Sequence, residues 1–271
     1  MPVPPAPPFR ARRAARRRRQ ALRLLEQVGL PILVVALGLL AWEALVAHYR
    51  IAPSLLPAPS AIYERLRETW PTLLAQAVPT AAETAGSFVL ATLAGVALAI
   101  VLTYSRLLNS ALYPAVVFFQ LIPKIALAPL FIVWMGIGSN ARLTFAVFIA
   151  FFPIVVATMA GLRSTPPDML RLCRGLTATS WQMFAYVRLP YALPQIFSGM
   201  KISVTFAMIG VIVAEFISAQ QGLGYLIVFA SSQADTALIL AAILVLCGVG
   251  LAMYALVVAA ERLVRRVYAA D

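Results

Sequence analysis

Long apolar runs separated by short polar links fill the chain from about residue 28 to residue 260. A helix needs ~20 apolar residues to cross a bilayer, and backbone amides in hydrocarbon must be hydrogen-bonded within their own segment. The pattern therefore predicts an all-α polytopic membrane protein of about six transmembrane helices. We place them near residues 28–46, 84–103, 112–135, 143–162, 195–217 and 236–260, with a short polar helix at 61–70 in the first long link.

Composition supports the same class. Apolar residues make up 62% of the chain, charged residues only 12%, and the mean hydropathy is +0.89, which excludes a soluble globular domain and a disordered body. The net charge of +12 does not indicate nucleic-acid binding, because eight arginines between Arg10 and Arg23 supply most of the excess just before the first apolar run. We expect residues 1–27 to form a basic tail on anionic lipid, and residues 28–271 to form the transmembrane domain.

The distribution of basic residues predicts the orientation. Sixteen of the 22 Lys and Arg residues lie in segments that six spans would place on one side of the membrane: the tail, the links after the second and fourth spans, and the C-terminal end. Four lie in the links on the opposite side. Because basic residues accumulate on the cytoplasmic side of a membrane, we expect both termini to lie in the cytoplasm. The expected location of the protein is the inner (cell) membrane.

Enzyme chemistry has no visible site in the sequence. One histidine, His48, cannot form a zinc-protease site, and the chain contains neither a G-x-x-x-x-G-K phosphate loop nor a G-x-S-x-G motif. Cys173 and Cys247 lack zinc-type spacing. We therefore expect no cofactor or metal on this chain and no catalysis by it, and energy for uphill transport would have to come from a partner.

The link between the fourth and fifth runs, residues 163–190, is far longer than the ~2–8 residues that join helices in a bundle. Pro166 and Pro167 indicate a helix start. Asp168 would lie in the first turn, where its negative charge interacts favourably with the helix dipole. Ser180 is expected to cap a second short helix, which the pair Leu189–Pro190 would end. The link therefore predicts two short projecting helices that form a docking surface, with Leu170, Cys173, Thr177 and Trp181 on one face and Arg171 and Arg174 available to acidic groups.

This link resembles the cytoplasmic "EAA" coupling loop of permease subunits of ATP-binding-cassette (ABC) importers. Aligned on Leu189–Pro190, the E-A-A triplet of that loop falls on Arg171, Leu172 and Cys173, and its glycine falls on Thr177. The terminal Leu-Pro and Arg174 match, whereas the acid and the glycine do not. Gly175, two residues earlier, is expected to supply the missing flexibility.

Other segments resemble the nitrate/sulfonate/taurine-type permeases of the same family. The run P-K-I-A-L-A-P-L-F-I-V-W-M-G at 123–136 carries the resemblance, as do F-P-I to G-L-R at 152–163 and L-P-x-A-L-P-x-I-x-x-G at 189–199. A-E-F at 214–216 followed by G-L-G-Y at 222–225 adds to it. The C-terminal part is most similar to the branch linked to pyrimidine precursors of thiamine.

The resemblance implies a type I ABC importer permease fold and a set of partners: a second copy of the chain, cytoplasmic ABC ATPase subunits, an extracytoplasmic solute-binding protein and membrane lipid. ATP would be used by the ATPase alone, and the solute would be a pyrimidine thiamine precursor or related heterocycle, or a sulfonate- or nitrate-like anion. A stand-alone secondary transporter or channel is the alternative, and the structured link at 163–190 argues against it.

Four residues are candidates for the translocation path: Gln120, Lys124, Thr205 and Glu215. Lys124 is the most specific of these candidates, because a lysine within an apolar run is costly in lipid and is expected to face protein or water. Pro123 and Pro129 around it predict a broken helix, which is tolerated where backbone lines a cavity. Lys124 would either meet a polar or anionic solute or pair structurally with a carbonyl or an acid, and Glu215 would either line the path or hold the Gly222–Tyr225 turn.

Overall fold

The computed structural model describes residues 29–218 and 220–268, and within these ranges every regular element is helical, as predicted. The N-terminal tail expected at 1–27 lies outside the described residues. The elements are α2 (Leu30–Tyr49), α3 (Pro59–Glu68), α4 (Trp70–Tyr104), α5 (Arg106–Leu121), the 3₁₀ turn η2 (Lys124–Leu127), α6 (Ala128–Met135), α7 (Ser139–Arg163), α8 (Pro167–Gly175), α9 (Ser180–Met183), the π-turn η3 (Phe184–Arg188), α10 (Leu189–Ser218), α11 (Leu223–Ser232) and α12 (Thr236–Tyr268).

Five helical segments in the described part are long and apolar enough to cross a membrane: α2, α4, α7, the stretch Ser180–Ser218 that ends with α10, and α12. The pair formed by α5 and η2–α6 is bent by 92° and makes a sixth when it is counted as one broken span. The break follows from Pro123, which lacks an amide proton and forces Ile122 out of the helical region, to φ −64° and ψ 137°. The prediction of about six spans agrees with this count.

Helix α4 begins at Trp70 rather than near residue 84, so the predicted start of the second span was too late. This stretch contains the polar residues Gln76, Thr80 and Glu83. All three accept or donate hydrogen bonds to groups on other elements, which allows α4 to carry them inside the bundle. The short helix expected at 61–70 is present as α3.

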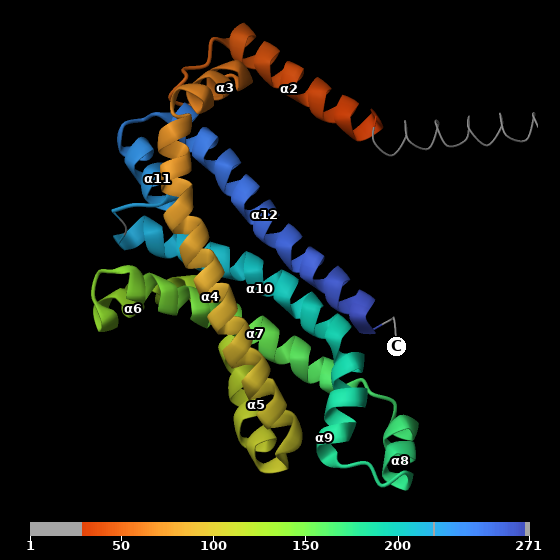
Figure 1. Cartoon of the computed structure of the whole chain (residues 1–271). Coiled ribbons are helices and arrows are strands. Elements are labelled where there is room, and N and C mark those ends of the chain that lie inside the picture. Colours follow the sequence, from red (N-terminus) through yellow and green to blue (C-terminus); the bar gives the residue numbers. More distant parts are fainter. Residues whose placement is uncertain (1–28, 219, 269–271) are drawn as a thin grey trace, which may run out of the picture.

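The core forms where α7 packs between α4 and α10 (Figure 1). Small residues allow these backbones to approach closely. A Cβ on Gly95 of α4 would lie 2.7 Å from Ile154 Cγ2, and one on Gly210 of α10 would lie 2.7 Å from the Cα of Ala146. The small residues Ala91, Gly95 and Ala99 recur at four-residue spacing along α4, and all three are buried.

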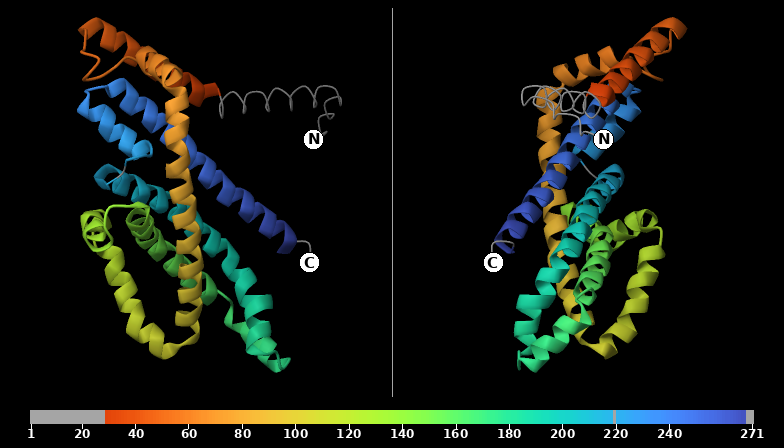
Figure 2. Two further views of the ribbon diagram at one scale, coloured as in Figure 1. Left: turned by 60° about the vertical axis from the view of Figure 1, so that its left-hand side comes forward. Right: turned by 90° about the vertical axis from the view of Figure 1, so that its right-hand side faces the viewer.

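Helix α2 extends away from this core, and Val46 is its one buried residue (Figures 1 and 2). It is joined to α3 through the Glu43 carboxylate, which accepts hydrogen bonds from the Ser60 amide at 3.0 Å and the Ser60 hydroxyl at 2.6 Å. Arg65 of α3 donates to Asp235, just before α12, from Nε at 3.0 Å and from a terminal nitrogen at 2.6 Å. These contacts fasten one end of the bundle.

The opposite end carries the α4–α5 hairpin and the segment that contains α8 and α9 (Figures 1 and 2). The link predicted at 163–190 therefore projects from the end of the bundle that lies away from α3. We call residues 163–190 the coupling elbow.

Candidate functional site

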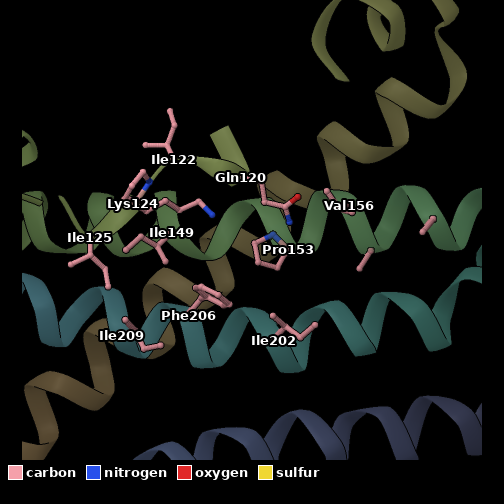
Figure 3. A pocket seen from close by; sticks show the side chains of 13 residues that line it. Gln120, Ile122, Lys124, Ile125, Ile149, Pro153, Val156, Ile202, Phe206 and Ile209 are labelled. Carbon is pink, nitrogen blue, oxygen red and sulfur yellow. The ribbon is translucent and has the colours of Figure 1, made fainter. Parts of the chain in front are cut away.

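A cavity of about 530 Å³ lies beside α7, between the bend that follows α5 and the facing helix α10. The Gln120 amide and the Lys124 amine are its two polar lining groups (Figure 3). The other lining residues are apolar: Ile122, Pro123, Ile125, Ile149, Pro153, Val156, Ala157, Ala160, Ile202, Phe206 and Ile209. The cavity can therefore hold a small molecule with a largely apolar surface and one or two polar ends.

Lys124 is placed at this cavity by the break in the third span. Its ammonium nitrogen lies 5.2 Å from the ring centroid of Phe152 and 5.9 Å from that of Phe206. Ring faces attract a cation over distances up to about 6 Å. None of the ion pairs and side-chain hydrogen bonds found in residues 29–218 and 220–268 includes Lys124, so the structural pairing with an acid or a carbonyl is not formed there.

The other two path candidates lie away from the cavity. The Thr205 side chain is exposed, and its hydroxyl donates to the Lys201 carbonyl one turn earlier in α10. Glu215 is 2% exposed, and its carboxylate accepts hydrogen bonds from the Thr80 hydroxyl and the Gly224 amide, both at 2.7 Å. The structure therefore brings Gln120 and Lys124 together and separates Thr205 and Glu215 from them.

Glu215 belongs to a buried polar cluster that caps α11. The first amides of this helix donate to three side chains: Gly222 to Gln76 at 2.6 Å, Leu223 to Thr80 at 2.9 Å, and Gly224 to Glu215. Gly222 has φ +108°, and a Cβ there would lie 2.2 Å from a Glu215 oxygen, so only glycine fits. This arrangement gives a physical reason for the A-E-F and G-L-G-Y segments occurring together.

A buried ion pair beside this cluster was missed by the sequence analysis. Arg142, at the start of α7, donates to both carboxylate oxygens of Glu83 in α4, at 3.0 and 2.5 Å, and Arg142 is 5% exposed. The only signal in the sequence was an acid directly before one apolar run and an arginine directly before another. Two such residues could lie on any pair of helices, so their pairing could not be inferred.

The coupling elbow contains two short helices, as predicted. Helix α8 carries six of the predicted residues, α9 carries Trp181, and Leu189 and Pro190 form the first turn of α10. Asp168 and Arg171 form an exposed pair at 3.4 Å, which contributes little to stability. Large apolar side chains on this surface are exposed: Leu172 59%, Leu176 70%, Trp181 71% and Tyr186 79%. The six residues on α8 are Asp168, Arg171, Leu172, Cys173, Arg174 and Gly175.

The turn between α8 and α9 depends on Thr177, which adopts the left-handed conformation with φ +58°. Its amide donates to the Arg174 carbonyl and the next amide, of Ala178, donates to the Cys173 carbonyl, both at 3.0 Å. These bonds form a Schellman motif, whose left-handed position is usually glycine. Gly175 lies within α8 and lacks a positive φ, so Thr177 and not Gly175 takes the left-handed position of this turn.

Two expected helix boundaries in the elbow also differ. The cap of α9 is Thr179, one residue before the expected Ser180, because Thr179 and Gln182 form a reciprocal capping box. Leu189–Pro190 does not end the second helix. The π-turn η3 carries the chain into α10, with the Leu189 amide donating to Phe184, and Pro190 falls in the first turn of α10, where its missing amide is tolerated.

The family called "Binding-protein-dependent transport system inner membrane component" matches residues 91–266. A Haemophilus influenzae protein named as a probable ABC transporter permease is 33% identical over 83% of this chain and 91% of its own length. The riboflavin transport system permease of Chloroflexus aurantiacus is 33% identical over 88% of this chain and 90% of its own length. The formylaminopyrimidine transport permease of Halalkalibacterium halodurans is 34% identical over 72% and 78%.

A solved structure supports the fold. A chain of the MetNI methionine ABC transporter, in an inward-facing conformation, matches 69% of this chain and 95% of its own length with a TM-score of 0.57 at 21% identity. The helix order, the coupling elbow and these matches confirm the family that the sequence motifs resemble. The chain is a multi-pass ABC importer permease and belongs to the family of inner-membrane components of binding-protein-dependent transport systems.

Proposed function

We propose that two copies of this chain form the path of an ABC importer, and that ATP hydrolysis by separate cytoplasmic subunits drives transport through the coupling elbow. The observation that carries the proposal is the placement of the elbow. It projects beyond the membrane-spanning helices at the end opposite α3 (Figure 1). The Lys124 cavity is instead lined by the bend after α5 and by residues within α7 and α10. The segment that would receive force from the ATPase and the cavity that would receive solute are thus separate parts of one helix bundle.

The surface of the elbow supports a protein partner. Four large apolar side chains are exposed on it next to Arg171 and Arg174, and the groove between α8 and α9 is lined by Cys173, Leu176, Thr177, Ala178, Gln182, Met183, Tyr186 and Val187. Exposed apolar patches with a charged rim mark interaction sites. The ATPase would bind to this surface. The elbow and both chain termini would then lie in the cytoplasm, and α3 would lie on the side of the solute-binding protein.

The apolar surface of α2 supports a second copy and lipid as neighbours. Within the described part of the chain, Val46 is the one buried residue of α2, and nearly all of the helix surface is exposed. An apolar span with so few contacts would have to be covered by lipid or by another subunit. The permease would therefore act as a homodimer in the inner membrane.

Lys124 and Gln120 would contact the solute at the bend of the third span. The ammonium group is balanced by two aromatic faces instead of a carboxylate, so it favours electronegative atoms and disfavours a cationic solute. One amine and one amide can satisfy a neutral molecule with a few acceptor atoms. They replace the hydration shell of a small sulfonate or nitrate poorly, because the remaining walls are apolar.

We infer from this that the solute is a small flat heterocycle, such as a pyrimidine precursor of thiamine, in preference to a sulfonate- or nitrate-like anion. The similarities support the same choice. The permeases named for riboflavin and formylaminopyrimidine are 33% and 34% identical to this chain, whereas the permeases named for taurine and aliphatic sulfonates are each 27% identical.

Two experiments test the proposal. The tagged permease should co-purify with an ATPase subunit from its native membrane, and replacement of Leu172, Leu176 and Trp181 by serine should abolish the complex, while the same change at exposed Leu55 on the α3 side should not. Co-purification that survives the triple change would contradict coupling through the elbow. Solute transport in liposomes by the permease alone would favour a stand-alone transporter or channel.

The second experiment measures uptake of radiolabelled formylaminopyrimidine, riboflavin and taurine by cells that produce the full transporter. We expect competition among the heterocycles and none from taurine. Lys124→Met should lower uptake by about tenfold, which corresponds to the loss of one charge-assisted hydrogen bond, and Lys124→Arg should retain part of it. Undiminished uptake by a correctly assembled Lys124→Met transporter would refute the role of Lys124.

A further inference from the structure

Both ends of the coupling elbow contact the α4–α5 hairpin, and an arginine makes the contact at each end. At the first end, Arg163 is the last residue of α7. Its guanidinium donates to the side-chain oxygen Oδ1 of Asn109 at 2.7 Å and lies 5.7 Å from the ring centroid of Tyr113. Asn109 and Tyr113 lie one turn apart on α5. The entry to the elbow is therefore attached to the side of α5.

The second end of the elbow also contacts the hairpin through an arginine and a tyrosine ring. Arg188 is the last residue of the π-turn, and its guanidinium lies 5.2 Å from the ring centroid of Tyr104, the last residue of α4. The Phe184 ring meets the same tyrosine edge-on, with the centroids 6.0 Å apart. The exit from the elbow is therefore attached to the hairpin directly before α5 begins.

Helix α5 is a suitable element to move. Val116 is its one buried residue, whereas α7 and α10 are buried along much of their length. Side-chain contacts, not the adjoining peptide bonds, join α5 to the elbow. The far end of α5 carries Gln120, and the bend that follows carries Lys124, so displacement of this helix moves one wall of the cavity relative to α7.

We propose that Arg163 and Arg188 are positioning residues that fasten the coupling elbow to the α4–α5 hairpin, so that movement of the elbow shifts α5 and the cavity wall formed by Gln120 and Lys124. The proposal rests on the function proposed above, because the force on the elbow comes from the ATPase. Neither arginine contacts the cavity, and their effect on solute is exerted through α5.

The contact chemistry determines which variants preserve the link. A cation over an aromatic ring requires the positive charge and the ring face but not the tyrosine hydroxyl. Tyr104→Phe with Tyr113→Phe should therefore behave as wild type, and lysine at 163 and 188 should retain most of the effect. Tyr104→Leu with Tyr113→Leu should weaken it, because only the hydrogen bond from Arg163 to Asn109 remains, and Arg163→Gln with Arg188→Gln should lose it. Arg106→Gln is the matched control, because Arg106 is exposed on the same hairpin.

The experiment measures two distances in the assembled permease–ATPase complex in lipid nanodiscs. Cys173 and Cys247 are first replaced by serine, and spin labels are placed at exposed positions, with Leu256 on α12 as the common reference. One distance runs from Leu256 to Ser180 on the elbow, and the other from Leu256 to Ala111 on α5. Both are recorded with and without ATP, and no solute is needed.

In the wild type, the phenylalanine pair and the Arg106→Gln control, ATP should change both distances. In the leucine and glutamine pairs, the elbow distance should still change while the α5 distance changes by less than half as much as in wild type. Equal α5 movement in those pairs would overturn the inference and leave the proposed function intact. An ATP-independent elbow distance in the wild type would overturn the proposed function and the inference with it. Equal loss in the phenylalanine pair would indicate a structural effect of the tyrosines and would also overturn the inference.

Discussion

Replacement of Thr177 by glycine should stabilise the turn between the two helices of the coupling elbow. Thr177 is at φ +58°, in the position of a Schellman motif that glycine normally occupies. The left-handed region costs a residue with a Cβ about 1–2 kcal/mol, and β-branched residues adopt it least readily. Glycine also loses more backbone entropy on folding, about 0.5–1 kcal/mol. The two effects leave a net gain of about 1 kcal/mol.

Hydrogen–deuterium exchange measures this gain locally. The amides of Thr177 and Ala178 donate to the last carbonyls of α8, so they exchange only when the turn opens. A gain of about 1 kcal/mol should slow their exchange about fivefold in Thr177→Gly. Thr177→Ala should give a smaller change in the same direction, because it removes the β-branch and keeps the Cβ.

Two control variants make the interpretation specific. Ala234 lies at φ +55° in the turn after α11, with the same pair of hydrogen bonds, so Ala234→Gly should slow exchange there and leave the elbow unchanged. Gly175→Ala lies inside α8 with open space around its Cβ and should stabilise the helix by up to ~1 kcal/mol. Faster exchange in Gly175→Ala, or unchanged exchange in Thr177→Gly, would refute the assignment of the strain to Thr177.

Three further predictions concern the buried polar groups, each measured as thermal unfolding of the purified protein in nanodiscs. Gly222→Ala should destabilise by at least ~2 kcal/mol, because a Cβ would displace Glu215, whereas Gly248→Ala, with open space around it, should not. Arg142→Met should cost about 3–5 kcal/mol by leaving Glu83 unpaired, and the added change Glu83→Leu should recover most of that loss; a double variant as unstable as the single one would contradict pairing. Lys201→Met should destabilise less, about 1–3 kcal/mol, because Glu261 keeps a second contact with Arg265, and equal losses at both pairs would be unexpected.

The spans and the break in the third one were predictable from the sequence. Apolar runs of sufficient length have only one way to satisfy their amides in lipid, and Pro123 removes a helical hydrogen bond at a defined position. The start of α4 and the passage through Pro190 were not predictable. Both depend on hydrogen bonds that form only in the folded chain. In α4, Gln76 bonds to Gly222 and Thr80 bonds to Glu215, and before Pro190 the Leu189 amide bonds to Phe184 through the π-turn.

The candidate site was predictable where one residue departed from its surroundings. Lys124 interrupts an apolar run, and its placement on a cavity follows from the cost of a charge in lipid. Thr177 could be recognised as a missing glycine, but the sequence could not reveal that threonine would accept the left-handed conformation itself. The Glu83–Arg142 pair joins residues 59 positions apart, and no local pattern records such a contact.

The surroundings of the interior charges separate structural from functional roles. Arg142 and Lys201 each meet a carboxylate at 2.5 Å, and Glu215 accepts two hydrogen bonds, so each of these groups has a partner that offsets its burial. Within the described ranges Lys124 forms no ion pair or side-chain hydrogen bond, and its ammonium lies near the rings of Phe152 and Phe206. An interior charge without a partner lowers stability, so selection for folding alone would favour an apolar residue at this position. A lysine at this position is explained if, as we propose, an arriving solute supplies the electronegative atom that its ammonium lacks.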